Sequence, residues 1–111
     1  SYSVVAEELP PFGEVVGYIL GAETIRRCTC VAIEALEAGL KGGLIPSSID
    51  RLPGKWIDPF TGEPLKIRHG SEELCVYSVG PDGVDDGGMS KEEAKKSGHK
   101  GWDYTVTIHL N

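Results

Sequence analysis

The feature that most constrains this chain is a long run of apolar residues at helical spacing between positions 12 and 40. Its members are Phe12, Val15, Val16, Ile19, Ile25, Cys28, Ala32, Leu36 and Leu40. Residues spaced by three and four lie on one face of a helix, so the run predicts a helical region over 12–43. Gly17 and Gly21 weaken its middle by roughly 1 kcal/mol each relative to alanine, which allows one long helix or two shorter ones. The Gly42-Gly43 pair is a typical helix end.

The remainder of the chain has the pattern of turns and antiparallel strands. Residues 1–11 end in Leu-Pro-Pro and predict an extended lead-in, and 44–64 predicts a loop with a Pro/Gly turn cluster at 58–64. Within 65–111 we expect a β-sheet, because 65–68 and 74–78 alternate as a hairpin and 102–110 alternates as a final strand. A helix at 91–97 interrupts an acidic, glycine-rich loop at 80–101.

Helix first and antiparallel strands afterwards predict an α+β fold, in which the N-terminal helix packs on a small sheet. The 111 residues are enough for a single domain, 1–111. The formal net charge of −6 argues against nucleic acid and against an anionic membrane surface as partners. Because residue 1 is Ser, we expect a trimmed or processed piece, with any signal peptide or anchor upstream.

The densest cluster of chemically informative residues lies at 80–88, where three aspartates and four glycines occur without a basic residue. Carboxylates this close repel one another unless a cation or water screens them. A tightly turned acidic loop suits Ca²⁺, which takes about six to eight oxygen ligands. The candidate ligands in and near this loop are Asp82, Asp85, Asp86 and Ser90, and Asp103 would return to it from the start of the last strand.

Two other interpretations of the acidic loop compete with a calcium site. Counted from Asp82, the ligand spacing nearly matches an EF-hand, but Val84 stands where a side-chain ligand is required and a strand leads in. Alternatively the segment is a solvated turn, since Asp and Gly are ordinary turn residues. Glu93, which would complete the EF-hand spacing, serves equally well as a capping residue of the helix at 91–97.

Residues that usually carry catalysis are scattered in this sequence. The histidines lie singly in a turn, a loop and a strand, without the spacing of a metal motif; they are His69, His99 and His109. Cys75 fits a half-buried strand residue better than a nucleophile. No glycine-rich phosphate loop precedes a helix. We therefore expect a protein that is not an enzyme.

Three segments, taken in order, resemble a known family. They are the Pro-Ser-Ser-Ile-Asp-Arg-Leu-Pro stretch at 46–53, Asp-Pro-Phe-Thr-Gly-Glu-Pro-Leu at 58–65 and Tyr-Ser-Val-Gly-Pro-Asp-Gly at 77–83. The chain thereby resembles the type II secretion major pseudopilins, from Ile25 to Leu110. It also resembles bacterial exported proteins of unassigned function that carry this module at the C-terminus, where Asp-Asp-Gly-Gly is the usual continuation.

This resemblance implies a pilin-like head with a Ca²⁺-stabilised loop and a structural, non-enzymatic role in protein transport. Asp82 falls on a side-chain ligand of the family, and Val79 would offer its backbone carbonyl. Asp85, Asp86, Ser90 and Asp103 compete for the later ligand places, because the insertion 89–101 precedes Asp103. The implied location is exported: periplasmic, cell-envelope or extracellular.

The partners implied by the resemblance are proteins, including other copies held through the N-terminal helix. The family's hydrophobic N-terminal half-helix and its cleavage motif are not in this sequence, so the resemblance covers the globular head and not filament assembly. Membrane attachment would need an anchor that is also not in it. The alternative function is a C-terminal module of a larger exported enzyme or ligand-binding protein.

The cysteines allow two outcomes in such a head. On a helical wheel Cys28 lies on the apolar side of the helix, towards the sheet that contains Cys75, while Cys30 lies on the other flank. In an oxidising compartment a Cys28–Cys75 disulfide is then possible. The alternative is three reduced thiols, two of which pack as small apolar side chains.

Overall fold

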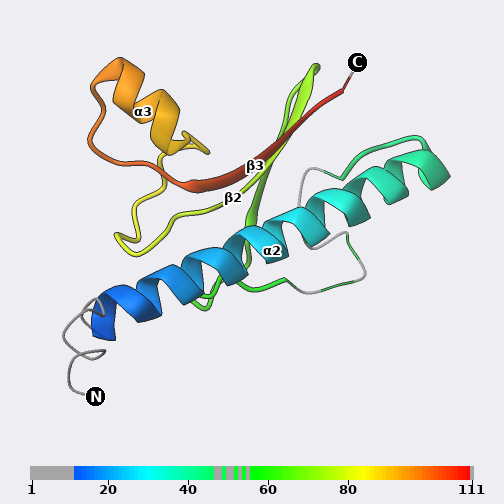
Figure 1. Ribbon diagram of the computed structural model, residues 1–111. Coiled ribbons are helices and arrows are strands. Elements are labelled where there is room, and N and C mark those ends of the chain that lie inside the picture. Colours follow the sequence, from blue (N-terminus) through cyan, green and yellow to red (C-terminus); the bar gives the residue numbers. More distant parts are fainter. Residues whose placement is uncertain (1–11, 47–48, 50–51, 53, 55, 111) are drawn as a thin grey trace, which may run out of the picture.

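The computed structural model describes residues 12–46, 49, 52, 54 and 56–110. Two helices and three strands follow one another as α2 (Phe12–Gly42), β1 (Lys66–His69), β2 (Glu73–Ser78), α3 (Lys91–Ser97) and β3 (Tyr104–His109). The expected lead-in at 1–11 lies outside the described residues, as does most of 47–55. Figure 1 shows α2 running across one face of the sheet, with α3 on the other side.

The expected helical region is a single continuous helix of 31 residues. Gly21 does not interrupt it, because the helix packs against the sheet there: a Cβ at this position would lie 3.2 Å from the Tyr104 ring. The helix ends as predicted, with Gly43 at φ +79° and its N–H donating to the Gly39 carbonyl at 2.7 Å.

The three strands form one antiparallel sheet in the order β1-β2-β3. In the hairpin Lys66 pairs with Tyr77 and His69 with Leu74; in the second pairing Glu73 faces His109 and Ser78 faces Tyr104. The hairpin and the final strand were both predicted from period-two alternation, and the structure confirms them. The central strand β2 is the most buried of the three.

The apolar core lies between α2 and the sheet. Alternate residues of β2 and β3 face the helix, as the pattern predicted. The buried cluster comprises Cys28, Val31, Ala32, Ala35, Ile49, Leu52, Leu65, Leu74 and Val76, with Val106, Ile108 and Leu110 packed against it. The fold is therefore α+β, with a long N-terminal helix against a three-stranded antiparallel sheet, which is a pilin-like topology.

The short helix α3 begins and ends at the predicted residues. The Ser90 hydroxyl accepts a hydrogen bond from the Glu93 N–H at 3.2 Å, and Gly98 closes the helix at φ 74°. Across the part of the chain that the structure describes, neither helix is apolar over a stretch long enough to cross a membrane.

Candidate functional site

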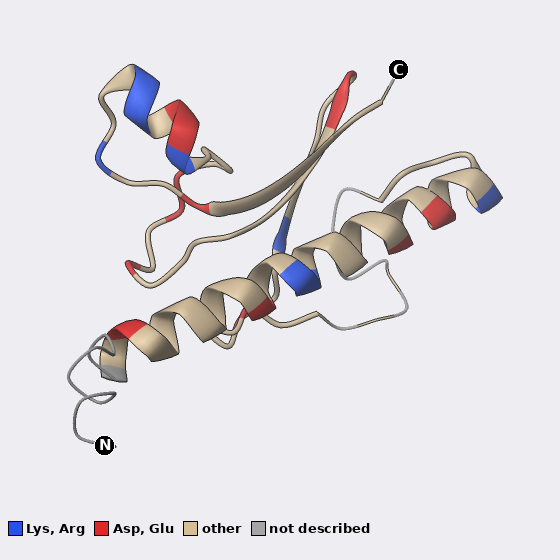
Figure 2. Ribbon diagram, in the orientation of Figure 1, with Lys and Arg blue, Asp and Glu red and all other residues tan. Residues whose placement is uncertain are grey.

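The acidic loop covers the face of the sheet opposite α2. Leu74 and Val76 point into the core, so Cys75 and Tyr77 point to the other face. There the Gly88 carbonyl lies 3.9 Å from Cys75 Sγ. Gly88 has φ +82°, and a Cβ on it would approach Tyr77 to 3.1 Å, so a side chain here would be strained and crowded. Acidic positions follow this loop and reach the start of β3 (Figure 2).

Asp103 is the residue that ties the loop together. Its side chain is 1% exposed. One carboxylate oxygen, Oδ2, accepts hydrogen bonds from the Asp86 N–H at 3.1 Å and the Gly88 N–H at 2.9 Å. Its own N–H donates to the Met89 carbonyl at 2.7 Å. The first residue before β3 thus fixes the backbone of a loop some 15 residues earlier in the chain.

Asp86 lies next to Asp103 and is almost as well covered, with its side chain 5% exposed. The chain passes closely over it at Gly101, where a Cβ would meet both carboxylate oxygens at 2.7 Å. A side chain at position 101 would therefore displace the Asp86 carboxylate. His99 stands at the rim: its Nδ1 is 3.9 Å from Asp86 Oδ1 and 2.9 Å from the Gly101 carbonyl.

Each of these two aspartates has a buried oxygen that is not satisfied by any described residue. They are Asp86 Oδ2 and Asp103 Oδ1. Burial raises the pKa of Asp103 above its ordinary value, and the neighbouring Asp86 carboxylate adds to the rise, although the Gly88 N–H opposes it. A buried acceptor left unpaired costs free energy unless water, a proton or a cation meets it. The arrangement is therefore suited to receive a positively charged group.

Asp82 and Asp85 lie on the exposed side of the same loop. Asp82 Oδ1 accepts from the Val84 N–H at 3.0 Å, and Asp85 Oδ1 accepts from the Gly87 N–H at 2.8 Å, the hydrogen bonds of Asx turns. Asp85 also lies 4.0 Å from Lys66 Nζ. Both aspartates shape the loop, as the solvated-turn interpretation expects.

The two remaining predicted ligands occupy structural positions. Ser90 uses its hydroxyl to cap α3, and Val79 is buried between β2 and Gly80. Among the described residues, no group of three or more His, Cys, Asp or Glu side chains is placed to hold a metal ion. The structure therefore brings Asp86 and Asp103 together. The Asp85 carboxylate also acts on Asp103, since its charge helps to raise that pKa, but its own Oδ1 closes a turn.

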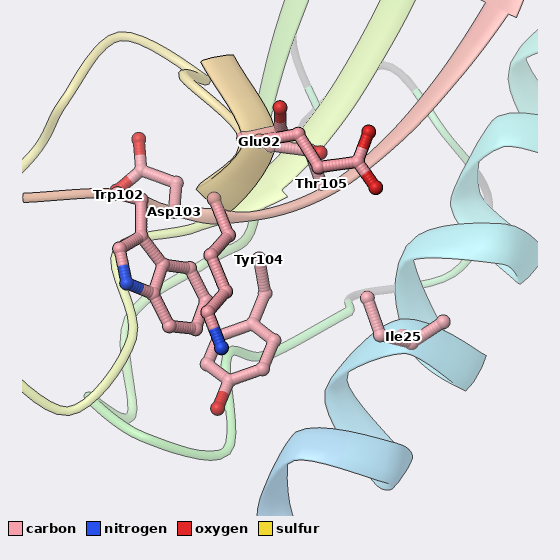
Figure 3. A pocket seen from close by; sticks show the side chains of 8 residues that line it. Ile25, Glu92, Trp102, Asp103, Tyr104 and Thr105 are labelled. Carbon is pink, nitrogen blue, oxygen red and sulfur yellow. The ribbon is translucent and has the colours of Figure 1, made fainter. Parts of the chain in front are cut away.

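A cleft lined by aromatic rings opens beside this pair, and sequence reasoning did not find it. Trp102 packs edge-on against Tyr104 with ring centres 5.0 Å apart, and Lys91 Nζ lies 5.5 Å from the Trp102 ring centre. Figure 3 shows Ile25 of α2 facing Tyr104 across the cleft. The alternation of Trp102 and Tyr104 around Asp103 was the available signal, and it indicates that both rings share one face.

Of the two outcomes that the sequence left open for the cysteines, the structure has the reduced one: Cys28, Cys30 and Cys75 are free thiols and no Cys28–Cys75 disulfide is formed. The prediction placed Cys28 correctly, since it is buried against the sheet, but Cys75 points to the opposite face. Strand alternation gives the reason, because Leu74 and Val76 take the positions facing α2. Burial, with Asp58 and Cys75 nearby, raises the pKa of Cys28 to about 12.

No family model matches this chain, and neither a curated protein nor a solved structure matches it.

Proposed function

We propose that this chain is a non-enzymatic structural module, a pilin-like head of an exported assembly of the kind formed by type II secretion pseudopilins. The observation that carries the proposal is the overhang of α2. A helix of 31 residues spans about 46 Å, more than twice the length of a six-residue strand. Its first turns project beyond the sheet (Figure 1).

The projecting turns carry apolar side chains that the domain itself leaves uncovered. Tyr18 is 71% exposed and Ile19 is 62% exposed. Apart from the helix itself, no described atom lies within 4 Å of the position of a Cβ at Gly13 or Gly17. Uncovered apolar residues on a protruding helix are typical of a surface that contacts other proteins. An exported protein partner, in the periplasm, the cell envelope or outside the cell, fits this surface.

We further propose that Ca²⁺ stabilises the acidic loop. Asp86 and Asp103 would be its two side-chain ligands, because each offers a buried oxygen that no described residue pairs and carboxylate oxygen is the ligand that Ca²⁺ prefers. Backbone carbonyls and water would complete the coordination. The bound ion would neutralise the repulsion between the two carboxylates and stiffen the loop over β2.

The structural role can be tested by sequencing the full gene that encodes this chain and by determining how its product is processed in cells. A hydrophobic half-helix with a prepilin peptidase site directly upstream of Ser1, cleaved in cells, is the expected result. A catalytic or ligand-binding domain upstream would overturn the proposal and favour the alternative, a C-terminal module of a larger exported protein.

A second arm of that test examines assembly directly. The domain, residues 1–111, fused to the hydrophobic half-helix of a major pseudopilin, should be incorporated into surface filaments visible by electron microscopy. The variant Ile19→Glu places a charge on the projecting turns, where no core contact is lost, and should reduce incorporation. Incorporation that is equal in both proteins would contradict a role for this surface.

A further inference from the structure

The two edges of the sheet differ in a way that the fold alone does not require. Edge strand β1 has four residues, and Lys66 and Arg68 supply the positive charges that commonly block pairing with another chain. Edge strand β3 has six residues, Tyr-Thr-Val-Thr-Ile-His, with no Lys, Arg, Asp, Glu, Pro or Gly among them. A longer strand of β-branched and aromatic residues with no charged residue of its own is suited to accept a further strand. Lys91 and Glu92 of α3 line a cleft with Thr105 near one end of this edge.

The register shows which backbone groups of β3 face outward. The Leu110 N–H donates to the Glu72 carbonyl at 2.8 Å, so the residues of β3 at even positions direct their backbone groups towards β2. The backbone N–H and C=O groups of Thr105, Thr107 and His109 then point away from the sheet. Among the described residues these three have no backbone hydrogen bond outside the strand. They form a free ladder at the open edge.

An apolar stripe on α2 lies on the same side of the molecule as this edge. The stripe consists of Tyr18, Ile25, Ile33 and Leu40, whose exposed fractions are 71%, 37%, 50% and 89%. Spacings of seven and eight residues keep the four side chains on one face of the helix. The stripe is therefore continuous along more than twenty residues of α2 and is not covered by the core.

Contacts on both flanks of α2 establish the direction of the stripe. On one flank Arg27 donates to the Ile57 carbonyl at 2.7 Å and Glu34 accepts from Trp56 Nε1 at 2.6 Å, so that flank lies over the segment leading into β1. On the other flank Ile25 lines a cleft with Tyr104 and Thr105 of β3 (Figure 3). The stripe thus faces the β3 side.

We propose that a second copy of this chain binds here, pairing β3 with β3 in antiparallel orientation about Thr107. Thr107 would face its own symmetry mate and Thr105 would face His109, which satisfies the free groups of all three residues in both copies. The three-stranded sheets become one continuous sheet. This inference concerns the sheet edge and does not depend on the pilin-like role.

Helix geometry favours a second copy over an unrelated extended peptide. The helix α2 contacts both β2 and β3, so we expect its axis to lie between these two strands, about half a strand spacing inside β3. With strands about 4.8 Å apart, the two α2 axes would be separated by about 9.6 Å, within the usual range for packed helices. In antiparallel orientation Ile25 would approach Ile33 of the other copy. A bare peptide on the β3 edge would leave the stripe uncovered.

The test is sedimentation equilibrium of the described domain from low micromolar to millimolar concentration, with paired edge variants. Thr107→Pro removes an outward N–H from β3, and the control His69→Pro does the same at the β1 edge, where the register also directs the group outward. We expect a monomer–dimer equilibrium in the wild type and in His69→Pro, weakened at least tenfold in Thr107→Pro. A monomer throughout the concentration range overturns the proposal.

A cross-link identifies the pairing and does not depend on a proline being tolerated. Residues directly opposite in a hydrogen-bonded pair have Cα atoms about 5.5 Å apart, which a disulfide can span. In a Cys30→Ser background, Thr107→Cys should form a covalent dimer under mild oxidation, whereas His69→Cys should not. Equal cross-linking of the two variants, or a dimer insensitive to Thr107→Pro but lost in Ile33→Glu, would show that the β3 edge is not the contact.

Discussion

The two faces of the sheet are stabilised by different kinds of interaction. Towards α2, β2 presents Leu74 and Val76 to a core of apolar side chains. Towards the acidic loop it presents Cys75 and Tyr77, which lie under a backbone held by the carboxylate of Asp103. The first face closes by burying apolar surface, which needs no added partner. The second face leaves two buried carboxylate oxygens without a hydrogen-bond partner among the described residues, so a bound cation would stabilise this face and not the first.

The largest expected effect comes from truncating the face towards α2. Leu74 is fully buried, so Leu74→Ala removes packing and leaves a cavity that costs about 3 kcal/mol of unfolding free energy. Cys75 is equally buried one residue later, but Cys75→Ala deletes a single atom and should cost much less. Urea unfolding of both variants compares the faces. Equal losses would mean that the α2 face does not dominate stability.

A smaller effect should follow removal of the carboxylate that organises the loop face. Asp103→Ala leaves the Asp86 and Gly88 N–H groups without their acceptor, but it also relieves repulsion with Asp86. The net effect should be a loss of about 2 kcal/mol of unfolding free energy. Hydrogen exchange should show lost protection at the Asp86 and Gly88 amides, while the Val76 amide stays protected. Loss of protection at all three would show that the two faces are not separable.

The loop face should also give the domain an unusual pH dependence when Ca²⁺ is chelated. Because the folded-state pKa of Asp103 is raised by burial, the folded chain binds this proton more tightly than the unfolded chain. The stabilisation is fully present below the ordinary Asp value of 3.8 and is lost as the pH rises through the raised value. Calorimetric melting across this window should reveal it, and Asp103→Asn should abolish it. A wild-type profile identical to that of Asp103→Asn contradicts the assignment.

The same difference between the faces explains how far the sequence could predict the structure. Val106 and Ile108 repeat with a period of two, so the pattern predicted the face of β3 that meets α2. The helix at 91–97 was predicted because Ser90 and Glu93 interact locally. Periodicity and capping are properties of neighbouring residues, and they determine most of this fold.

The loop could not be predicted in the same way, because its geometry depends on residues far apart in the sequence. Asp82 was selected by its place in a short motif, yet it closes a local turn. Asp103 meets Asp86 in a region where the backbone passes closely at Gly101 and Gly88, and no spacing rule reveals this contact. The face of Cys75 is a related case: its position in the sheet was predicted, but the side to which it points depended on the register of β2 against the core.

The measurement that tests the account most directly is the effect of Ca²⁺ on thermal unfolding of the wild type and of Asp103→Asn, with chelator and matched NaCl as controls. We expect free Ca²⁺ at tenfold its Kd to raise the unfolding free energy of the wild type by about 1.4 kcal/mol. Asp103→Asn should show little or no gain, and Asp82→Asn should keep the gain, because Asp82 lies on the exposed side of the loop. A wild-type melting temperature that Ca²⁺ leaves unchanged, or a gain that Asp82→Asn removes and Asp103→Asn keeps, would contradict a cation site built on Asp86 and Asp103.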